Sequence, residues 1–235
     1  QVEERVGGKM VFEVMPGVES PATISAWDPP RRLAAEDPGW APGMPPVATE
    51  WTVEAREGGK CLVRVVHSLF ASTDDWDSQL EGTESGWPAC FRILRLHLTD
   101  FRGQRCSLMR AVGMAGGAEA DAWKRVSEAL GATGLTAGQR WAAGAGAPPL
   151  AGVIEQFSEA KDHHDLLVRL EQPAPGAAWV NLFDCGGSVM ASLAFYLYGD
   201  AAAAVAQRDE PLWRDWMSKQ FPAPSEASTA AGGND

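Results

Sequence analysis

The stretch GWPACFRILRLHLTDF, Gly86 to Phe101, decides the fold of the first part of the chain, because it has the pattern of one amphipathic helix. Its large apolar residues recur at steps of three and four and therefore share one face of a helix. They are Trp87, Phe91, Leu94, Leu98 and Phe101, with Cys90 and His97 beside them. The polar residues fall on the opposite side, where we expect water: Arg92, Arg95, Thr99 and Arg102.

Four short strands are expected before this helix. KMVFEV, ATISAW, VATEWTVEA and KCLVRVVHSLF carry strand patterns, with the clearest alternation in the third and fourth. In the last two, Thr49, Trp51 and Val53 share a face, as do Val63, Val65 and His67. The Pro- and Gly-rich residues from Asp28 to Pro46 are interpreted as loop. Strands joined by tight turns indicate an antiparallel meander with one buried face.

The second half repeats the order of strands followed by a helix, without a residue-level repeat. A Gly/Ala-rich linker is expected at 105–118, then a helix closed by Gly131. LAGVIEQF, DLLVRL and AAWVNLFD are predicted strands, and GSVMASLAFYLYG, apolar nearly all round, is predicted to be a buried helix. Another helix is expected around Pro211, and a disordered tail at 222–235.

Composition narrows the class of protein. The chain has 235 residues and a formal net charge of -11, so nucleic acid and anionic membrane surfaces are poor partners. The polar N-terminal residues do not form a secretory signal, which makes the cytoplasm the expected location. Cys61, Cys90, Cys106 and Cys185 have no metal-site or disulfide spacing and are expected to be small buried residues.

Three segments together resemble a known family. They are GGKMVFEVMPGVESPATISAWDPPRRL, ATEWTVEAREGGKCLVRVVHSLF and ESGWPACFRILRLHL, spread over roughly residues 7 to 102. They are similar to the START-like superfamily called SRPBCC, in the branch of the activators of the heat-shock protein 90 ATPase (AHSA-like). Residues 118 to 220 resemble an extra segment of longer bacterial members.

The resemblance implies an α+β helix-grip fold, in which a curved antiparallel sheet wraps a long helix and an apolar cavity lies between them. We expect a START-like helix-grip domain at 1–104 and a smaller α+β extension at 119–221. Family members begin with an edge strand and two short helices, which this sequence lacks ahead of its first strand. Either the sequence is a fragment, which is the preferred explanation, or its second half supplies the missing cover.

The cavity implied by the resemblance defines the candidate ligand-binding residues. Those on the two predicted inner faces are Phe12, Trp51, Val65, His67, Trp87, Phe91, Leu94, His97 and Leu98. His67 and His97 are also candidate general acids or bases, although a core histidine bonded to backbone is the commoner case. The run KDHHD at 161–165 has metal-ligand residue types but is expected to be a solvated turn. No catalytic triad, phosphate loop or zinc pattern is present, so we expect neither a metal nor a cofactor.

Three functions follow as hypotheses. The preferred one is binding of a hydrophobic small molecule in the cavity, which could be regulatory, without catalysis. The second is an enzyme similar to polyketide cyclases and dehydratases, which the resemblance brings in. The third is an interaction protein that contacts a chaperone, as the name of the branch suggests; fold alone does not choose among them.

Overall fold

The computed structural model describes residues 2–15, 18–39, 45–70, 77–160, 163–184 and 188–222. The chain divides into two compact units, Gln1–Leu80 and Glu81–Asp235, each built on one antiparallel sheet. The α+β class is therefore confirmed. The division falls inside α1 (Asp77–Asp100), whereas the sequence suggested a first domain that ends at residue 104. The tail predicted at 222–235 lies almost entirely outside the described residues.

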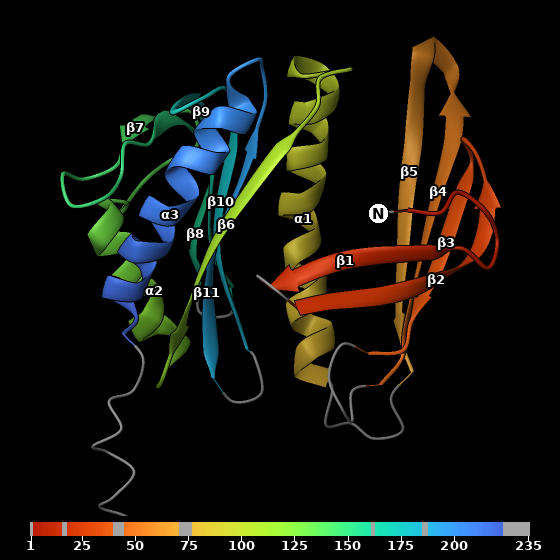
Figure 1. Cartoon of the computed structure of the whole chain (residues 1–235), viewed down its shortest axis with the longest axis horizontal. Coiled ribbons are helices and arrows are strands. Elements are labelled where there is room, and N and C mark those ends of the chain that lie inside the picture. The colour runs from red at the N-terminus through yellow and green to blue at the C-terminus, as the bar shows by residue number, and fades with distance from the viewer. Residues whose placement is uncertain are drawn as a thin grey trace, which may run out of the picture. The chain divides into compact units, whose positions relative to one another are not determined.

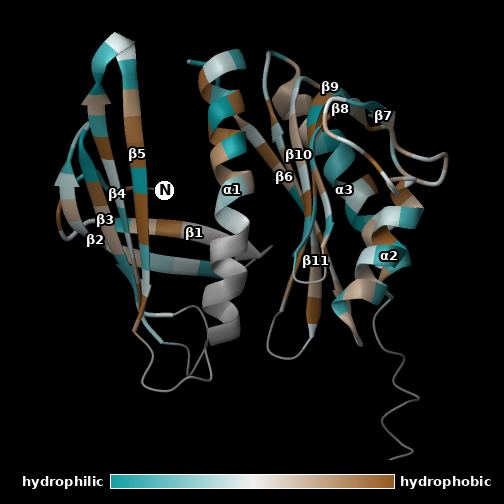
Figure 2. Cartoon of the chain, turned by 180° about the vertical axis from the view of Figure 1, so that it is seen from behind, coloured by the Kyte–Doolittle hydropathy of each residue, from teal (hydrophilic) through white to brown (hydrophobic). Residues whose placement is uncertain are grey.

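The first sheet has five strands in sequence order, β1-β2-β3-β4-β5 (Figure 1). They are β1 (Lys9–Met15), β2 (Val18–Asp28), β3 (Arg32–Asp37), β4 (Val47–Arg56) and β5 (Lys60–Leu69). The turn η1 (Glu57–Gly59) joins β4 to β5, and its Gly58 has a φ of 72°, which glycine adopts without strain. Figure 2 shows hydrophobic and hydrophilic residues along β5.

The loop predicted between Asp28 and Pro46 is wrong in part, because β3 lies within it. Its sequence RLAAED has two alanines and no β-branched residue, so propensity gives no strand signal. This segment is a strand because its backbone pairs with β2 on one side and with β4 on the other. Among the described side chains, the buried cluster of this sheet is formed by Met10, Ala22, Ile24 and Ala35, with Trp27 and Leu33 packed against it.

The second sheet has six strands in the order β6-β11-β10-β9-β8-β7. They are β6 (Ser107–Ala115), β7 (Arg140–Ala142), β8 (Ala151–Ala160), β9 (His163–Gln172), β10 (Gly176–Asp184) and β11 (Val189–Leu197). The buried helix predicted over GSVMASLAFYLYG is wrong, because this segment is β11. A strand covered on both faces is apolar throughout and loses the alternation that marks a strand.

Helices cover both faces of the second sheet. The helices α2 (Glu119–Leu130) and α3 (Ala202–Gln220) lie on one face, and α1 from Glu81 onward lies on the other (Figure 1). The main core fills the α2/α3 side, where Phe195 packs at 5.0 Å, centroid to centroid, on Trp213. Gly131, at φ 65°, closes α2 as predicted. No helix in the described residues is long and apolar enough to cross a membrane.

The linker predicted at 105–118 is also wrong, because most of it is β6. Met109, Ala111 and Ala115 of this strand are buried in the main core. The small residues that suggested a linker are required by packing. A Cβ at Gly113 would lie 2.7 Å from Cδ2 of Phe221, so only glycine lets the end of α3 approach the strand this closely.

The second unit has the helix-grip arrangement in its own right. An edge strand, β6, and a helix, α2, precede five strands in sequence order, and the long helix α3 follows and crosses the sheet. Among the described residues, the main buried cluster of this expected α+β extension is larger than that of the first sheet. Since β6 pairs with β11, it completes the second sheet, and within the described residues it forms no pair with the first.

Candidate functional site

The hairpin of β4 and β5 carries three of the sequence-predicted site residues. Trp51 pairs with Val65, and Thr49 pairs with His67, so these four side chains share one face of the first sheet. Trp51, Val65 and His67 are each half-buried. The alternation read from the sequence is therefore confirmed for this hairpin, including the common face of Trp51, Val65 and His67.

His67 is held by a neighbour that the sequence analysis did not single out. Its Nδ1 lies 2.8 Å from Oγ1 of Thr49, a hydrogen-bond distance. Burial lowers the pKa of His67, because removing the imidazole from water disfavours its charged form. At neutral pH the ring is therefore an uncharged hydrogen-bonding group on an apolar face. The register of the hairpin was the signal that could have identified Thr49.

The same face continues onto the middle of the sheet. Leu33 of β3 pairs with Trp51, and Trp27 of β2 pairs with Leu33. Trp27 and Leu33 pack on the buried cluster of this unit, so the apolar surface extends from Val65 toward the core. Phe12 lies in β1 opposite Ser20, and its side chain lies outside the described residues.

The helical site residues lie on α1, which from Glu81 onward belongs to the second unit. Trp87 and Phe91 have ring centroids 6.0 Å apart and are half-buried, as is Leu94, whereas Leu98 is 51% exposed. The side of α1 that contacts the second sheet is a different one, with Ile93 buried against Leu167 and Ala177. That these helical residues line a cavity with the first sheet remains a prediction.

His97 contacts Tyr198, the residue that directly follows β11. Its ring lies 5.5 Å from that of Tyr198, centroid to centroid, and Phe101 stacks on the same tyrosine at 4.3 Å. His67 and His97 thus lie in different units, and the common interior expected for them remains a prediction. The arginines predicted to face water, Arg92, Arg95 and Arg102, are exposed as expected, as is Thr99.

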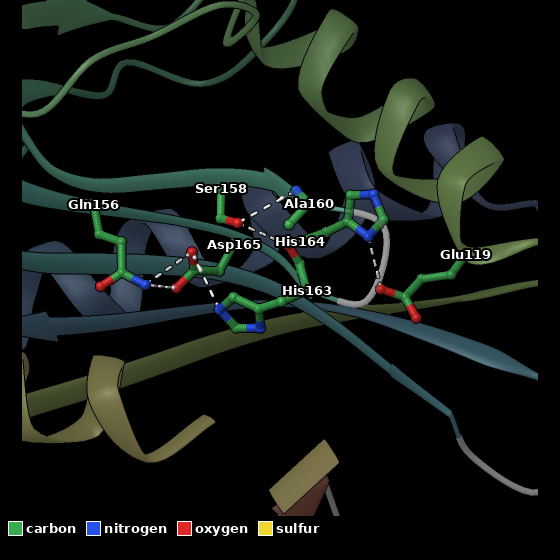
Figure 3. Close-up of polar contacts among 7 residues, drawn as sticks. All are labelled: Glu119, Gln156, Ser158, Ala160, His163, His164 and Asp165. Atoms are coloured by element: carbon green, nitrogen blue, oxygen red, sulfur yellow. Dashed lines mark hydrogen bonds and ion pairs between the residues drawn. The ribbon is translucent and has the colours of Figure 1, made fainter. Parts of the chain in front are cut away.

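The run KDHHD is not the solvated turn that its polarity suggested. Residues 161 and 162 lie outside the described residues, but His163, His164 and Asp165 begin β9 (Figure 3). His164 is 6% exposed and its Nδ1 lies 2.8 Å from Oε1 of Glu119 at the start of α2. Pairing with β8 holds these polar residues in the sheet, which their residue types alone do not indicate.

Asp165 points to the opposite face of β9 from His164. Its carboxylate is 0% exposed and accepts hydrogen bonds from Nε2 of Gln156 at 2.8 and 3.1 Å. Nε2 of His163 lies 3.5 Å from Oδ1 of Asp165. Burial raises the pKa of Asp165, while the charge of His163 and the bond from Gln156 act in the opposite direction with smaller effect.

Cysteine positions differ from the sequence expectation. Cys61 and Cys106 are exposed and Cys90 is half-buried, so the expectation that they are buried is wrong for the first two. Burial raises the pKa of Cys90, which keeps its thiol protonated. Cys185 lies outside the described residues. Among the residues that the structure describes, no three His, Cys, Asp or Glu side chains gather as metal ligands.

Comparison with protein families finds one match in the first part of the chain. Residues 1–99 match the family described as "Activator of Hsp90 ATPase homolog 1-like protein". The match confirms the resemblance read from the sequence over these residues. It contains the whole β4–β5 hairpin and all the candidate ligand-binding residues.

No curated protein matches the chain. Among solved structures, the di-domain ARO/CYC BexL from the BE-7585A biosynthetic pathway is 13% identical, with a TM-score of 0.37, covering 96% of this chain and 88% of that one. DynU16, a putative protein in the dynemicin biosynthetic locus, is 13% identical, with a TM-score of 0.35 and coverages of 92% and 81%. The di-domain ARO/CYC StfQ from the steffimycin biosynthetic pathway is 12% identical, with a TM-score of 0.31 and coverages of 97% and 91%.

Proposed function

We propose that the chain binds a hydrophobic small molecule on the face of the first sheet that carries Trp51, Val65 and His67. The observation that supports this proposal is the composition of that face, where half-buried apolar side chains surround one neutral imidazole. Ligand sites are largely apolar, with a few polar groups that fix the orientation of the ligand. That Trp87, Phe91, Leu94 and Leu98 of α1, with His97 beside them, contribute to ligand binding stays the sequence-based prediction.

The role of His67 in this proposal is to recognise a polar tip on an otherwise apolar ligand. A neutral imidazole costs less to cover with an apolar molecule than a charged one does. The Thr49 hydroxyl, bonded to Nδ1, fixes the orientation of the ring. A ligand with an aromatic body and one hydroxyl group satisfies both the apolar surface and the imidazole.

Two matched probes, pyrene and 1-hydroxypyrene, test this proposal by fluorescence titration of the full chain. We expect one saturable site for each, weakened by Val65→Ala but not by Leu62→Ala. Leu62 is 47% exposed and lies on the other face of the same strand, which makes it a matched control. His67→Ala should weaken 1-hydroxypyrene about three- to tenfold and spare pyrene, because only the former loses a hydrogen bond.

Catalysis remains the alternative. Our sequence-based preference for a non-catalytic role has no support from the comparisons. Two of the similar structures are named as ARO/CYC proteins. If His67 acts as a general acid or base, His67→Ala would abolish turnover and leave the binding of pyrene intact. If the wild-type chain has no saturable site for either probe, the proposal fails and a chaperone-contacting interaction protein becomes the better hypothesis.

A further inference from the structure

The hydrogen bond between Thr49 and His67 restricts which group of a ligand can bond to the imidazole. The two residues pair across the β4–β5 hairpin, and Oγ1 of Thr49 lies 2.8 Å from Nδ1 of His67. Because Nδ1 bonds to Thr49, a ligand bond to this ring must use Nε2. Whether Nε2 donates or accepts depends on which partner supplies the proton in the Thr49 bond.

The charge of the ring limits it to two tautomers. Burial lowers the pKa of His67, so at neutral pH the imidazole is uncharged and carries one proton. That proton lies on Nδ1 or on Nε2, and the nitrogen that lacks it can only accept a hydrogen bond. The two tautomers therefore present opposite groups to a ligand, an Nε2–H donor in one and an Nε2 lone pair in the other.

The Thr49 hydroxyl favours one of these tautomers. In the part of the chain that the structure describes, this hydroxyl forms a hydrogen bond to His67 alone. If Nδ1 carried the proton and donated it to Oγ1, the hydroxyl hydrogen would have no acceptor among these residues. If the hydroxyl donates to Nδ1, one bond satisfies both groups. The difference is largest beneath an apolar ligand, which excludes the water that otherwise accepts the hydroxyl hydrogen.

We propose that Thr49 is a positioning residue that holds His67 as its Nε2–H tautomer, so that this face selects an aromatic molecule with a carbonyl oxygen. The carbonyl preference rests on the proposed function, because it concerns the same face of the first sheet. The carbonyl oxygen accepts the Nε2–H, and the aromatic body packs on Trp51 and Val65, which pair next to Thr49 and His67 and are half-buried. A phenol fits less well, because its proton finds no acceptor at Nε2.

The tautomer can be measured without a ligand. Long-range ¹H–¹⁵N NMR spectra of the full chain at neutral pH distinguish a protonated imidazole nitrogen from an unprotonated one, and His67→Gln identifies the signals of this ring. We expect the proton on Nε2 in the wild type and a mixture of tautomers in Thr49→Val. Thr49→Ser keeps a hydroxyl group and should restore the wild-type spectrum. Thr52→Val makes the same change on the other face of β4 and should leave the tautomer unchanged.

Two probes of nearly equal shape, 1-acetylpyrene and 1-isopropenylpyrene, test the class of ligand. They differ at one position, where a carbonyl oxygen replaces a methylene group. In fluorescence titrations of the full chain, 1-acetylpyrene should bind about three- to tenfold more tightly, which is the effect of one hydrogen bond. This preference should be lost in His67→Ala, reduced in Thr49→Val and kept in Thr52→Val.

A proton on Nδ1 of His67 in the wild type would overturn the proposal, as would an unchanged tautomer in Thr49→Val. Saturable binding of both probes with equal affinity would overturn the carbonyl preference and leave the proposed function standing. If neither probe has a saturable site, the carbonyl preference and the proposed function fail together. The NMR measurement of the tautomer does not depend on either titration.

Discussion

The two sheets of this chain differ most in the elements added to them and in how deeply their side chains are buried. The first consists of five strands in sequence order, and the second contains five such strands, β7 to β11. A helix comes next in the chain after each series, α1 after the first and α3 after the second. The second sheet adds β6 and α2 and has a core in which Phe195, Trp213 and Met217 are almost fully buried. The first has a small buried cluster and leaves Trp51, Val65 and His67 half-buried. Among the described residues, the second unit thus has the more extensive buried core, and the first keeps half-buried side chains on one face of its sheet.

The largest expected effect tests this difference in packing directly. Trp213→Ala should lower the free energy of unfolding by about 3–5 kcal/mol, because it opens a cavity next to Phe195 and Trp216. Trp51→Ala removes the same side chain from a half-buried position and should cost much less. Chemical denaturation of both variants measures the two losses. Equal losses would show that the first sheet is packed as tightly as the second.

The next prediction concerns which side of α1 is structural. The sequence pattern placed Leu94 on the apolar face of the helix, but the residue that the structure buries against Leu167 and Ala177 is Ile93. Ile93→Ala should cost about 2–4 kcal/mol, whereas Leu94→Ala, at a half-buried position, should cost less. Arg95→Ala, exposed on the same helix, should change stability by less than about 0.5 kcal/mol. If thermal unfolding ranks Leu94→Ala above Ile93→Ala, the stripe read from the sequence is the structural face after all.

A smaller effect is expected at the strand that the sequence suggested was a linker. Gly113→Ala places a methyl group 2.7 Å from Cδ2 of Phe221 and should cost about 1–3 kcal/mol by overpacking. Gly116→Ala is the matched control three residues later, where a Cβ meets nothing within 4 Å. Urea denaturation of the pair compares them. A linker, as first predicted, would tolerate both changes equally well.

The sequence predicts the strands and helices whose patterns are local. The β4–β5 hairpin follows from its alternation, and α2 from its helical pattern and the closing Gly131. The strands β8, β9 and β10 follow from short apolar segments separated by polar or Pro-rich stretches. It fails where packing overrides the pattern. β11 lacks alternation because both of its faces are covered, β3 has no strand propensity, and β6 contains glycine because α3 lies close to it.

For the candidate site, too, only the positions that follow from a local pattern can be predicted from the sequence. Facing positions on one hairpin follow from the alternation of its strands, so Trp51, Val65 and His67 could be placed together from the sequence. Asp165 and Gln156 could not, because their proximity depends on the register of β8 and β9, which no local pattern encodes. The burial of Asp165 also contradicts the usual exposure of its residue type.

The smallest expected effect is the pH dependence that His67 gives to the first sheet. Burial lowers the pKa of this residue in the folded chain below its value in the unfolded chain, about 6.5. The unfolded chain therefore binds the proton more readily than the folded chain does. The free energy of unfolding is thus highest above about pH 6.5 and falls as the pH falls below that value. His67→Gln removes this titration, so its unfolding midpoint should change less between about pH 7 and pH 5 than that of the wild type.

Because the ring is only half-buried, the change should be small, and pyrene bound to the wild type should enlarge it by excluding water from the imidazole. Thermal unfolding of both proteins across this range, with and without pyrene, measures the difference. If pyrene shifts the midpoint equally at both ends of the range, the ligand does not cover His67, and the first sheet differs from the second only in its packing.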